Sequence, residues 1–178
     1  MSKSGSHNGE MNDKEKKVVV VSGGFDPIHI GHVRLFQNAR NLGTELVVIL
    51  NNDNWLRKKK NHVFMPEDER REIIESLKGV DRVVLTKHEP NPKDMSVCRE
   101  LREIKPDIFA QGGDRSKEDA ENPNSSQNPE AILCQELGIE IVYNVGHGGK
   151  VQSSSWLLGK YLEAKSNSGA EKNKVREA

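Results

Sequence analysis

The sequence has little cysteine, few aromatic residues and no excess of either charge. Cys98 and Cys134 are the only cysteines in 178 residues; they lack zinc-site spacing, which favours free thiols in a reducing cytoplasm. Lys and Arg together number 27, as do Asp and Glu, so the formal net charge is zero. With no overall positive field and only 4% aromatic residues, broad recognition of nucleic acid is disfavoured.

Long apolar runs are also missing. No stretch reaches the roughly 20 apolar residues that a membrane-spanning helix needs, and no secretory signal is visible. We therefore expect a soluble, cytoplasmic protein. Residues 1–16 and 164–178 are polar and lack apolar periodicity, which predicts disordered tails. Residues 17–163 then form a single domain of ordinary size.

Short apolar runs alternate with longer amphipathic segments along residues 17–163. Runs that are almost continuously apolar are typical of strands buried on both faces. Strands are predicted over 17–23, 45–52, 81–86, 107–112 and 140–145. Helices are predicted over 31–42, 66–78, 94–104, 129–137 and 153–163. This order predicts an α/β fold: a Rossmann-like, doubly wound, parallel five-stranded sheet with helices on both faces. Ligands of such folds bind at the carboxyl ends of the strands.

The stretch GGFDPIHIGH, residues 23–32, joins the first predicted strand to the first helix. Its two leading glycines let backbone approach a ligand closely, and a helix N-terminus offers N–H groups and a positive dipole end. A triphosphate would suit this position. The stretch is not a Walker loop, because no Gly-Lys-Ser/Thr follows. His29 and His32 are instead the candidate positive groups.

Three interpretations of the histidine pair compete. A metal site needs more ligands, and only Asp26 is close in sequence. A packed core pair conflicts with a position on the predicted ligand rim. We favour the third, in which both imidazoles donate hydrogen bonds to phosphate oxygens and stabilise charge on a pentacoordinate phosphorus. No protein metal ligands are predicted.

The segment GGFDPIHIGHVRLFQNA resembles the signature of the cytidylyltransferase-like nucleotidyltransferase superfamily, in which H-x-G-H follows a strand and G-x-F-D. Over 17–163 the chain is similar to heptose 1-phosphate adenylyltransferases and glycerol-3-phosphate cytidylyltransferases. The resemblance implies a homodimeric enzyme that transfers a nucleoside monophosphate from ATP to a sugar phosphate of the heptose 1-phosphate type, releasing pyrophosphate. The alternative is a CTP-dependent enzyme acting on glycerol 3-phosphate or another phosphorylated sugar or alcohol. Mg²⁺ would bridge the triphosphate, held mostly by substrate and water.

The same resemblance implies the site residues. Catalysis is assigned to His29, His32 and Lys60, the last preferred over Lys58 and Lys59 in a basic loop. Nucleotide binding is assigned to Gly24, Phe25, Asp26, Gly31, Arg70, Gly112, Gly113, Asp114, Ser153, Ser154 and Ser155. Substrate binding is assigned to Asn52, Asp53 and Trp55 from their place on the predicted ligand rim after the second strand, with a packing role for Trp55 left open.

The chain also departs from the family pattern. Gln111 stands where the family usually has a lysine, and the arginine shortly before the serine cluster is absent, which leaves His147, Lys150 or Gln152. The loop over 115–129 has no clear counterpart. A nucleotide-binding regulatory protein without catalysis therefore stays open, and so does an RNA-binding module, although the neutral charge disfavours it.

Overall fold

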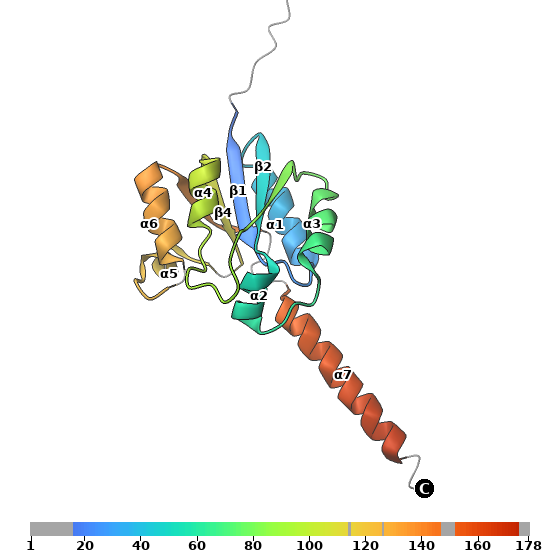
Figure 1. The fold of residues 1–178 in the computed structure, drawn as a ribbon. Coiled ribbons are helices and arrows are strands. Elements are labelled where there is room, and N and C mark those ends of the chain that lie inside the picture. The colour runs from blue at the N-terminus through green and yellow to red at the C-terminus, as the bar shows by residue number, and fades with distance from the viewer. Residues whose placement is uncertain (1–15, 114, 126, 147–151, 175–178) are drawn as a thin grey trace, which may run out of the picture.

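The computed structural model describes residues 16–113, 115–125, 127–146 and 152–174. A parallel five-stranded sheet lies at its centre (Figure 1). Its strands are β1 (Val18–Gly23), β2 (Glu45–Leu50), β3 (Arg82–Leu85), β4 (Ile108–Gly112) and β5 (Glu140–Val145). Their order across the sheet is β3-β2-β1-β4-β5: β2 and β3 are added on one side of β1, and β4 and β5 on the other, so the strand order reverses between β1 and β4. The predicted fold class is confirmed, and such a reversal is where ligands bind in open α/β sheets.

The helices follow the predicted alternation with two additions. They are α1 (Ile30–Arg40), α2 (Asp53–Lys60), α3 (Glu67–Glu75), α4 (Cys98–Ile104), α5 (Lys117–Glu121), α6 (Asn128–Leu137) and α7 (Ser154–Lys174). Short α5 lies inside the segment predicted as the 115–129 loop. The basic run before Asn61, predicted as a loop, is the last turn of α2. Asn52 begins that helix by accepting a hydrogen bond from the Trp55 N–H at 3.1 Å, and cations in a last turn suit the helix dipole.

Helix α7 extends away from the sheet (Figure 1). Its first turn is attached to the body by the Ser154 hydroxyl, which donates to the Pro27 carbonyl at 3.0 Å. The helix ends at Lys174, so the predicted end at residue 163 is wrong, and the helix enters the segment predicted as a disordered tail. Nearly all of the tail predicted over 1–16 lies outside the described residues. The division into one domain and two tails stays a prediction.

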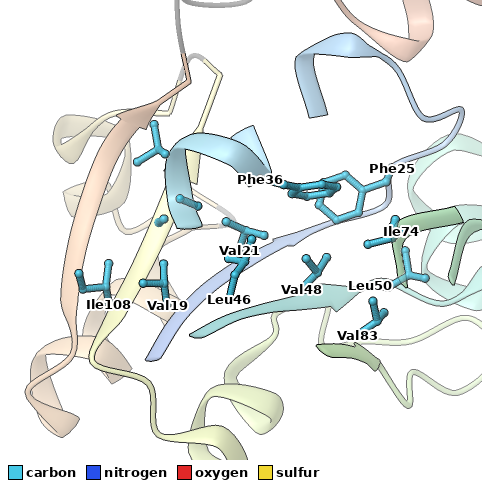
Figure 2. Packing of buried hydrophobic residues seen from close by; sticks show 13 residues of the cluster. Val19, Val21, Phe25, Phe36, Leu46, Val48, Leu50, Ile74, Val83 and Ile108 are labelled. Carbon is cyan, nitrogen blue, oxygen red and sulfur yellow. The ribbon is translucent and has the colours of Figure 1, made fainter. Parts of the chain in front are cut away.

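Two apolar clusters cover the two faces of the sheet. Successive residues of β1 point to opposite faces: Val19 and Val21 join one cluster and Val20 the other. Figure 2 shows the first cluster, in which Phe36 of α1 packs edge-to-face on Phe25, with ring centroids 5.1 Å apart. The second cluster contains residues of α4 and α6. Among the described residues, no helix is long and apolar enough to cross a membrane.

Among the described glycines, Gly43, between α1 and β2, has the tightest surroundings. A Cβ atom there would lie 2.5 Å from the Lys17 carbonyl oxygen and 2.7 Å from a Val19 methyl. That carbonyl also accepts hydrogen bonds from the Thr44 and Glu45 N–H groups, so it has little freedom to move.

We expect Gly43→Ala to lower the free energy of unfolding by about 1–3 kcal/mol, the usual cost of overpacking. The matched control is Gly159→Ala in α7, where a Cβ would meet no atom within 4 Å and where Ala favours the helix. Denaturant unfolding of both variants measures the difference. Equal stability of Gly43→Ala and the wild type would contradict the close approach.

Candidate functional site

The carboxyl ends of β1, β4 and β5, together with α1, α2 and the start of α7, enclose a cleft of about 300 Å³. This is the rim on which the sequence places the ligand. Twelve of the predicted site residues line the cleft: Gly24, Phe25, His29, Gly31, His32, Trp55, Lys60, Gly112, Gly113, Ser153, Ser154 and Ser155. Asp114 lies outside the described residues, as do His147 and Lys150.

The histidine pair forms the N-terminal cap of α1. The Nδ1 atom of His29 accepts a hydrogen bond from the Gly31 N–H at 3.2 Å, and the Nδ1 atom of His32 accepts one from the His29 N–H at 3.3 Å. The two rings are stacked, with centroids 3.6 Å apart and planes 21° apart. Because each Nδ1 is an acceptor, we assign the proton of each neutral ring to Nε2. Two Nε2–H donors on stacked rings therefore belong to residues that line the cleft.

The charge of the pair differs from the prediction. Burial, and then the neighbouring His29 and Lys60, lower the pKa of His32 from 6.5 to about 3. The pKa of His29 is lowered chiefly by burial, and Lys60 lowers it further against an opposing backbone hydrogen bond. Both imidazoles are thus neutral at pH 7 in the free protein. In the free protein they are therefore not the positive groups that the sequence suggested, while their charge with a phosphate bound and their role as donors stay predictions.

Phe25 holds the second histidine in place. Its ring meets His32 edge-on at 4.9 Å and Phe36 at 5.1 Å. Its φ of 48° lies in the left-handed region, which is unusual for an aromatic residue and recurs near functional sites. A Cβ at Gly23 would lie 2.8 Å from the Phe25 ring, so a glycine is required next to it.

Lys60 is the lysine that reaches the cleft. It is the last residue of α2, is half-buried, and its ammonium donates to the Asp26 carbonyl oxygen at 2.8 Å. Burial lowers its pKa; nearby Asp26 opposes this shift and Arg70 adds to it. Lys58 and Lys59 are exposed, and Lys58 donates to Asn91 at 2.6 Å. Of the three lysines considered from the sequence, only Lys60 lines the cleft.

Arg70 lies behind the cleft wall. Its side chain has no exposed surface. Its guanidinium donates to the carbonyls of Met65 (2.8 Å), Gly24 (2.7 Å) and Asn51 (2.8 Å), and it pairs with the Asp53 carboxylate at 2.7 Å. In the free protein it therefore positions backbone, and the structure does not bring it to the place where a phosphate would lie.

Three other predicted site residues have similar internal contacts. The Asp26 carboxylate accepts from the Phe64 and Met65 N–H groups at 2.8 and 2.7 Å. Asn52 caps α2, and Asp53 pairs with Arg70. None of the three lines the cleft. Trp55 does, and its indole N–H donates to the Met95 carbonyl at 2.8 Å, which fixes the ring as part of the wall.

Two cleft arginines were not identified from the sequence. Arg34 reaches the cleft from α1, two residues after His32, and Arg115 reaches it from the segment after β4, where Nη1 donates to the Gln111 Oε1 atom. The lining that the structure describes contains no carboxylate. Within the same described ranges, no three His, Cys, Asp or Glu residues are grouped as a metal site.

The cytidylyltransferase-like family matches residues 20–134, more than half of the chain. This match includes the histidine pair and Lys60, and it confirms the predicted superfamily. The FAD synthase of Aciduliprofundum boonei is 39% identical over 123 residues, which cover 69% of this chain and 73% of that protein. The FAD synthase of Ferroglobus placidus is 39% identical over 99 residues, but the match covers only 60% of its length.

Solved structures agree in fold. The lipopolysaccharide core biosynthesis protein of Thermoplasma volcanium superposes with a TM-score of 0.57 at 26% identity, covering 75% of this chain and 99% of that one. TmcAL of Thermotoga maritima, bound with α-thio ATP, has a TM-score of 0.55 at 13% identity and shares the fold alone.

We expect Arg70→Ala to lower the free energy of unfolding by about 3–5 kcal/mol, because it leaves the half-buried Asp53 carboxylate and three carbonyls without their donor. Its sequence neighbour supplies the control: Arg71 is exposed and pairs with Glu75 at 2.7 Å, so Arg71→Ala should change stability by no more than about 0.5 kcal/mol. Denaturant unfolding measures both. A stable Arg70→Ala that loses only nucleotide affinity would restore the direct phosphate contact predicted from the sequence.

The lowered pKa of His32 predicts a pH dependence. The folded value of about 3 lies below the ordinary 6.5, so the unfolded chain binds more protons between these values. Stability contributed by the neutral ring is complete above pH 6.5 and is lost as the pH falls from 6.5 toward 3. His32→Gln should remove this part of the dependence. By NMR, the wild-type His32 ring should not titrate between pH 8 and 5; a midpoint near 6.5 would disprove the neutral assignment.

Proposed function

Since the chain belongs to the cytidylyltransferase-like family, we propose that it is an adenylyltransferase that transfers AMP from ATP to the phosphate of FMN. The products are FAD and pyrophosphate. One structural observation carries the transfer chemistry: two stacked neutral imidazoles with Nε2–H donors at the start of α1, inside a cleft. The acceptor rests on the relatives, which are named FAD synthase and are 35–39% identical.

The chemistry is an in-line displacement. An oxygen of the FMN phosphate attacks the α-phosphorus of ATP, and the bond from that phosphorus to the bridging oxygen of the β-phosphate breaks. Negative charge then moves onto the departing pyrophosphate. The protein needs no covalent intermediate, so its task is to position the two phosphates and stabilise this charge.

Several residues of the cleft can position the phosphates and stabilise the developing charge. The Nε2–H groups of His29 and His32 donate to phosphate oxygens where charge develops, at the positive end of the α1 dipole. Lys60 adds a positive charge from α2. Gly24 lines the same cleft and carries no side chain of its own, so its backbone is the part that a ligand can meet. Ser153 and Ser155, at the start of α7, offer hydroxyl donors to the same anion, whereas the Ser154 hydroxyl already donates to the Pro27 carbonyl.

Mg²⁺ fits this site only as an ion carried by the nucleotide. The described lining offers no carboxylate, and the ion would be held by phosphate oxygens and water, where it would reduce the charge of the triphosphate. The base and flavin need flat, apolar surfaces, and the fixed Trp55 indole supplies one. Homodimer formation and a cytoplasmic location stay predictions.

A sugar phosphate acceptor is the second candidate, as the sequence predicts. It is supported by the likeness to the Thermoplasma volcanium lipopolysaccharide core biosynthesis protein, nearly all of which this chain covers. The same histidines and lysine would serve, because the displacement at the α-phosphorus is unchanged. CTP remains the alternative nucleotide.

The test is turnover with defined substrates. With ATP, Mg²⁺ and FMN, the full chain should form FAD and pyrophosphate in equal amounts, separated by chromatography. Replacing ATP with CTP, or FMN with heptose 1-phosphate or glycerol 3-phosphate, should reduce the yield strongly. His29→Ala and His32→Ala should each lower kcat about 10²–10³-fold, the usual loss for one transition-state donor, while Arg71→Ala should not.

The outcomes separate the candidates. Pyrophosphate release with a sugar phosphate but not with FMN would transfer the assignment to the second candidate. Triphosphate binding without pyrophosphate release from any acceptor would instead indicate a regulatory protein. Unchanged turnover in both histidine variants would rule out the mechanism given above.

A further inference from the structure

The positive groups named in the mechanism neutralise a bound triphosphate only partly. His29 and His32 are neutral donors, so among the groups named in the mechanism Lys60 alone carries a positive charge. The described lining contains two further cations, Arg34 and Arg115. Arg34 is exposed on the surface of α1, whereas Arg115 is half-buried and held by another side chain.

Arg115 is oriented by a buried amide. Gln111, near the end of β4, is only 5% exposed, and its Oε1 atom accepts a hydrogen bond from Nη1 of Arg115. An amide oxygen fixes the direction of the guanidinium without cancelling its charge, as a carboxylate would. One of the five guanidinium N–H groups makes this contact, and the planar fork of the group is suited to paired hydrogen bonds with phosphate.

The sheet order places Arg115 across the histidines from Lys60. Strand β1, which leads into the histidine pair, lies between β2 and β4. Lys60 is on the helix that follows β2, and Arg115 is on the segment that follows β4. A triphosphate seated on the histidines would therefore have one cation on each side.

We propose that Arg115, oriented by Gln111, binds the phosphates of the nucleoside triphosphate from the β4 side of the cleft. This assignment rests on the proposed use of ATP and adds a residue that the sequence did not indicate. A structural role is the competing explanation, because the charge of Arg115 also acts on the buried carboxyl of Glu130. The two roles differ in what they predict for ligands of different phosphate number.

Calorimetric titration of the full chain with ATP and with AMP distinguishes the two roles. Arg115→Ala should weaken ATP binding about 10- to 100-fold, the scale of a hydrogen bond to a charged group, and should change AMP binding much less. The KM for FMN should stay the same. Arg115→Lys keeps the charge without the fork and should recover part of the loss. Arg99→Ala is the control, since Arg99 pairs with Glu103 on an exposed face.

Gln111→Leu tests the orienting contact. It should weaken ATP binding less than Arg115→Ala does, and the double variant should bind ATP no worse than Arg115→Ala alone, because the amide acts through the arginine. Thermal unfolding of each variant measures any structural role. Should Arg115→Ala fail to fold, the ratio of ATP affinity to AMP affinity in Arg115→Lys and Gln111→Leu decides between the phosphate-binding role and the structural role.

Wild-type ATP affinity in Arg115→Ala, or an equal loss for ATP and AMP, would overturn the inference. Lower thermal stability with unchanged ATP affinity would also overturn it and assign Arg115 to Glu130. The proposed function fails separately. If the wild type binds ATP but forms no FAD, the proposed acceptor is wrong, while the comparison of ATP and AMP binding still tests the phosphate-binding role of Arg115.

Discussion

The architecture of the cleft depends on one buried cation. The guanidinium of Arg70 joins the turn after β1, the end of β2 and the segment before α3 through three carbonyl oxygens, and it pairs with Asp53 at the start of α2. A charged group without exposed surface is costly unless its donors are all used and its charge is paired. These segments must therefore converge on Arg70 for the chain to fold.

That convergence determines where the ligand-facing groups lie. Gly24 and α2 are brought so close that a Cβ on Gly24 would lie 2.8 Å from a Leu56 methyl. Asp26 secures the same region by accepting from two N–H groups of the segment before α3, and its own carbonyl receives the Lys60 ammonium. Lys60 thus reaches the cleft from the end of α2. Arg70 holds the start of that helix through Asp53, and the Asp26 carbonyl holds the Lys60 ammonium. Arg70 and Asp26, which the family resemblance assigns to nucleotide binding, lie in this structure behind the residues that line the cleft, and that assignment stays a prediction.

The fold and the centre of the candidate site were predictable because the sequence patterns that indicate them each lie within a few consecutive residues. Each strand is a short apolar run, and the histidine pair, the glycines and the start of α1 lie within ten residues of one another. Helix α2 was not predictable in the same way. Leu56 is its one buried residue, so no apolar stripe marks it, and its four terminal cations are also typical of a loop.

The charge of the histidines and the roles of the arginines depend on contacts that sequence spacing does not encode. The pKa of His32 is lowered by burial first, then by the neighbouring His29 and by Lys60, which is 28 positions away in the chain. Arg70 and Arg71 are neighbours in the sequence, yet one is completely buried and the other exposed. Arg115 follows the glycine pair after β4 closely, but its direction comes from a hydrogen bond to Gln111.

Neutral imidazoles explain how two donors can stack at 3.6 Å in front of a helix N-terminus. Two positive rings at that distance would repel each other, and the positive end of the α1 dipole would oppose both. Neutral rings avoid this cost and keep their Nε2–H groups directed by the backbone contacts of Nδ1. The positive charge then lies at the flanks, on Lys60, which donates to the Asp26 carbonyl, and on Arg115, which donates to the Gln111 amide oxygen. In the proposed function, the centre of the site would supply hydrogen bonds of fixed direction, and its edges would supply the charge that a triphosphate requires.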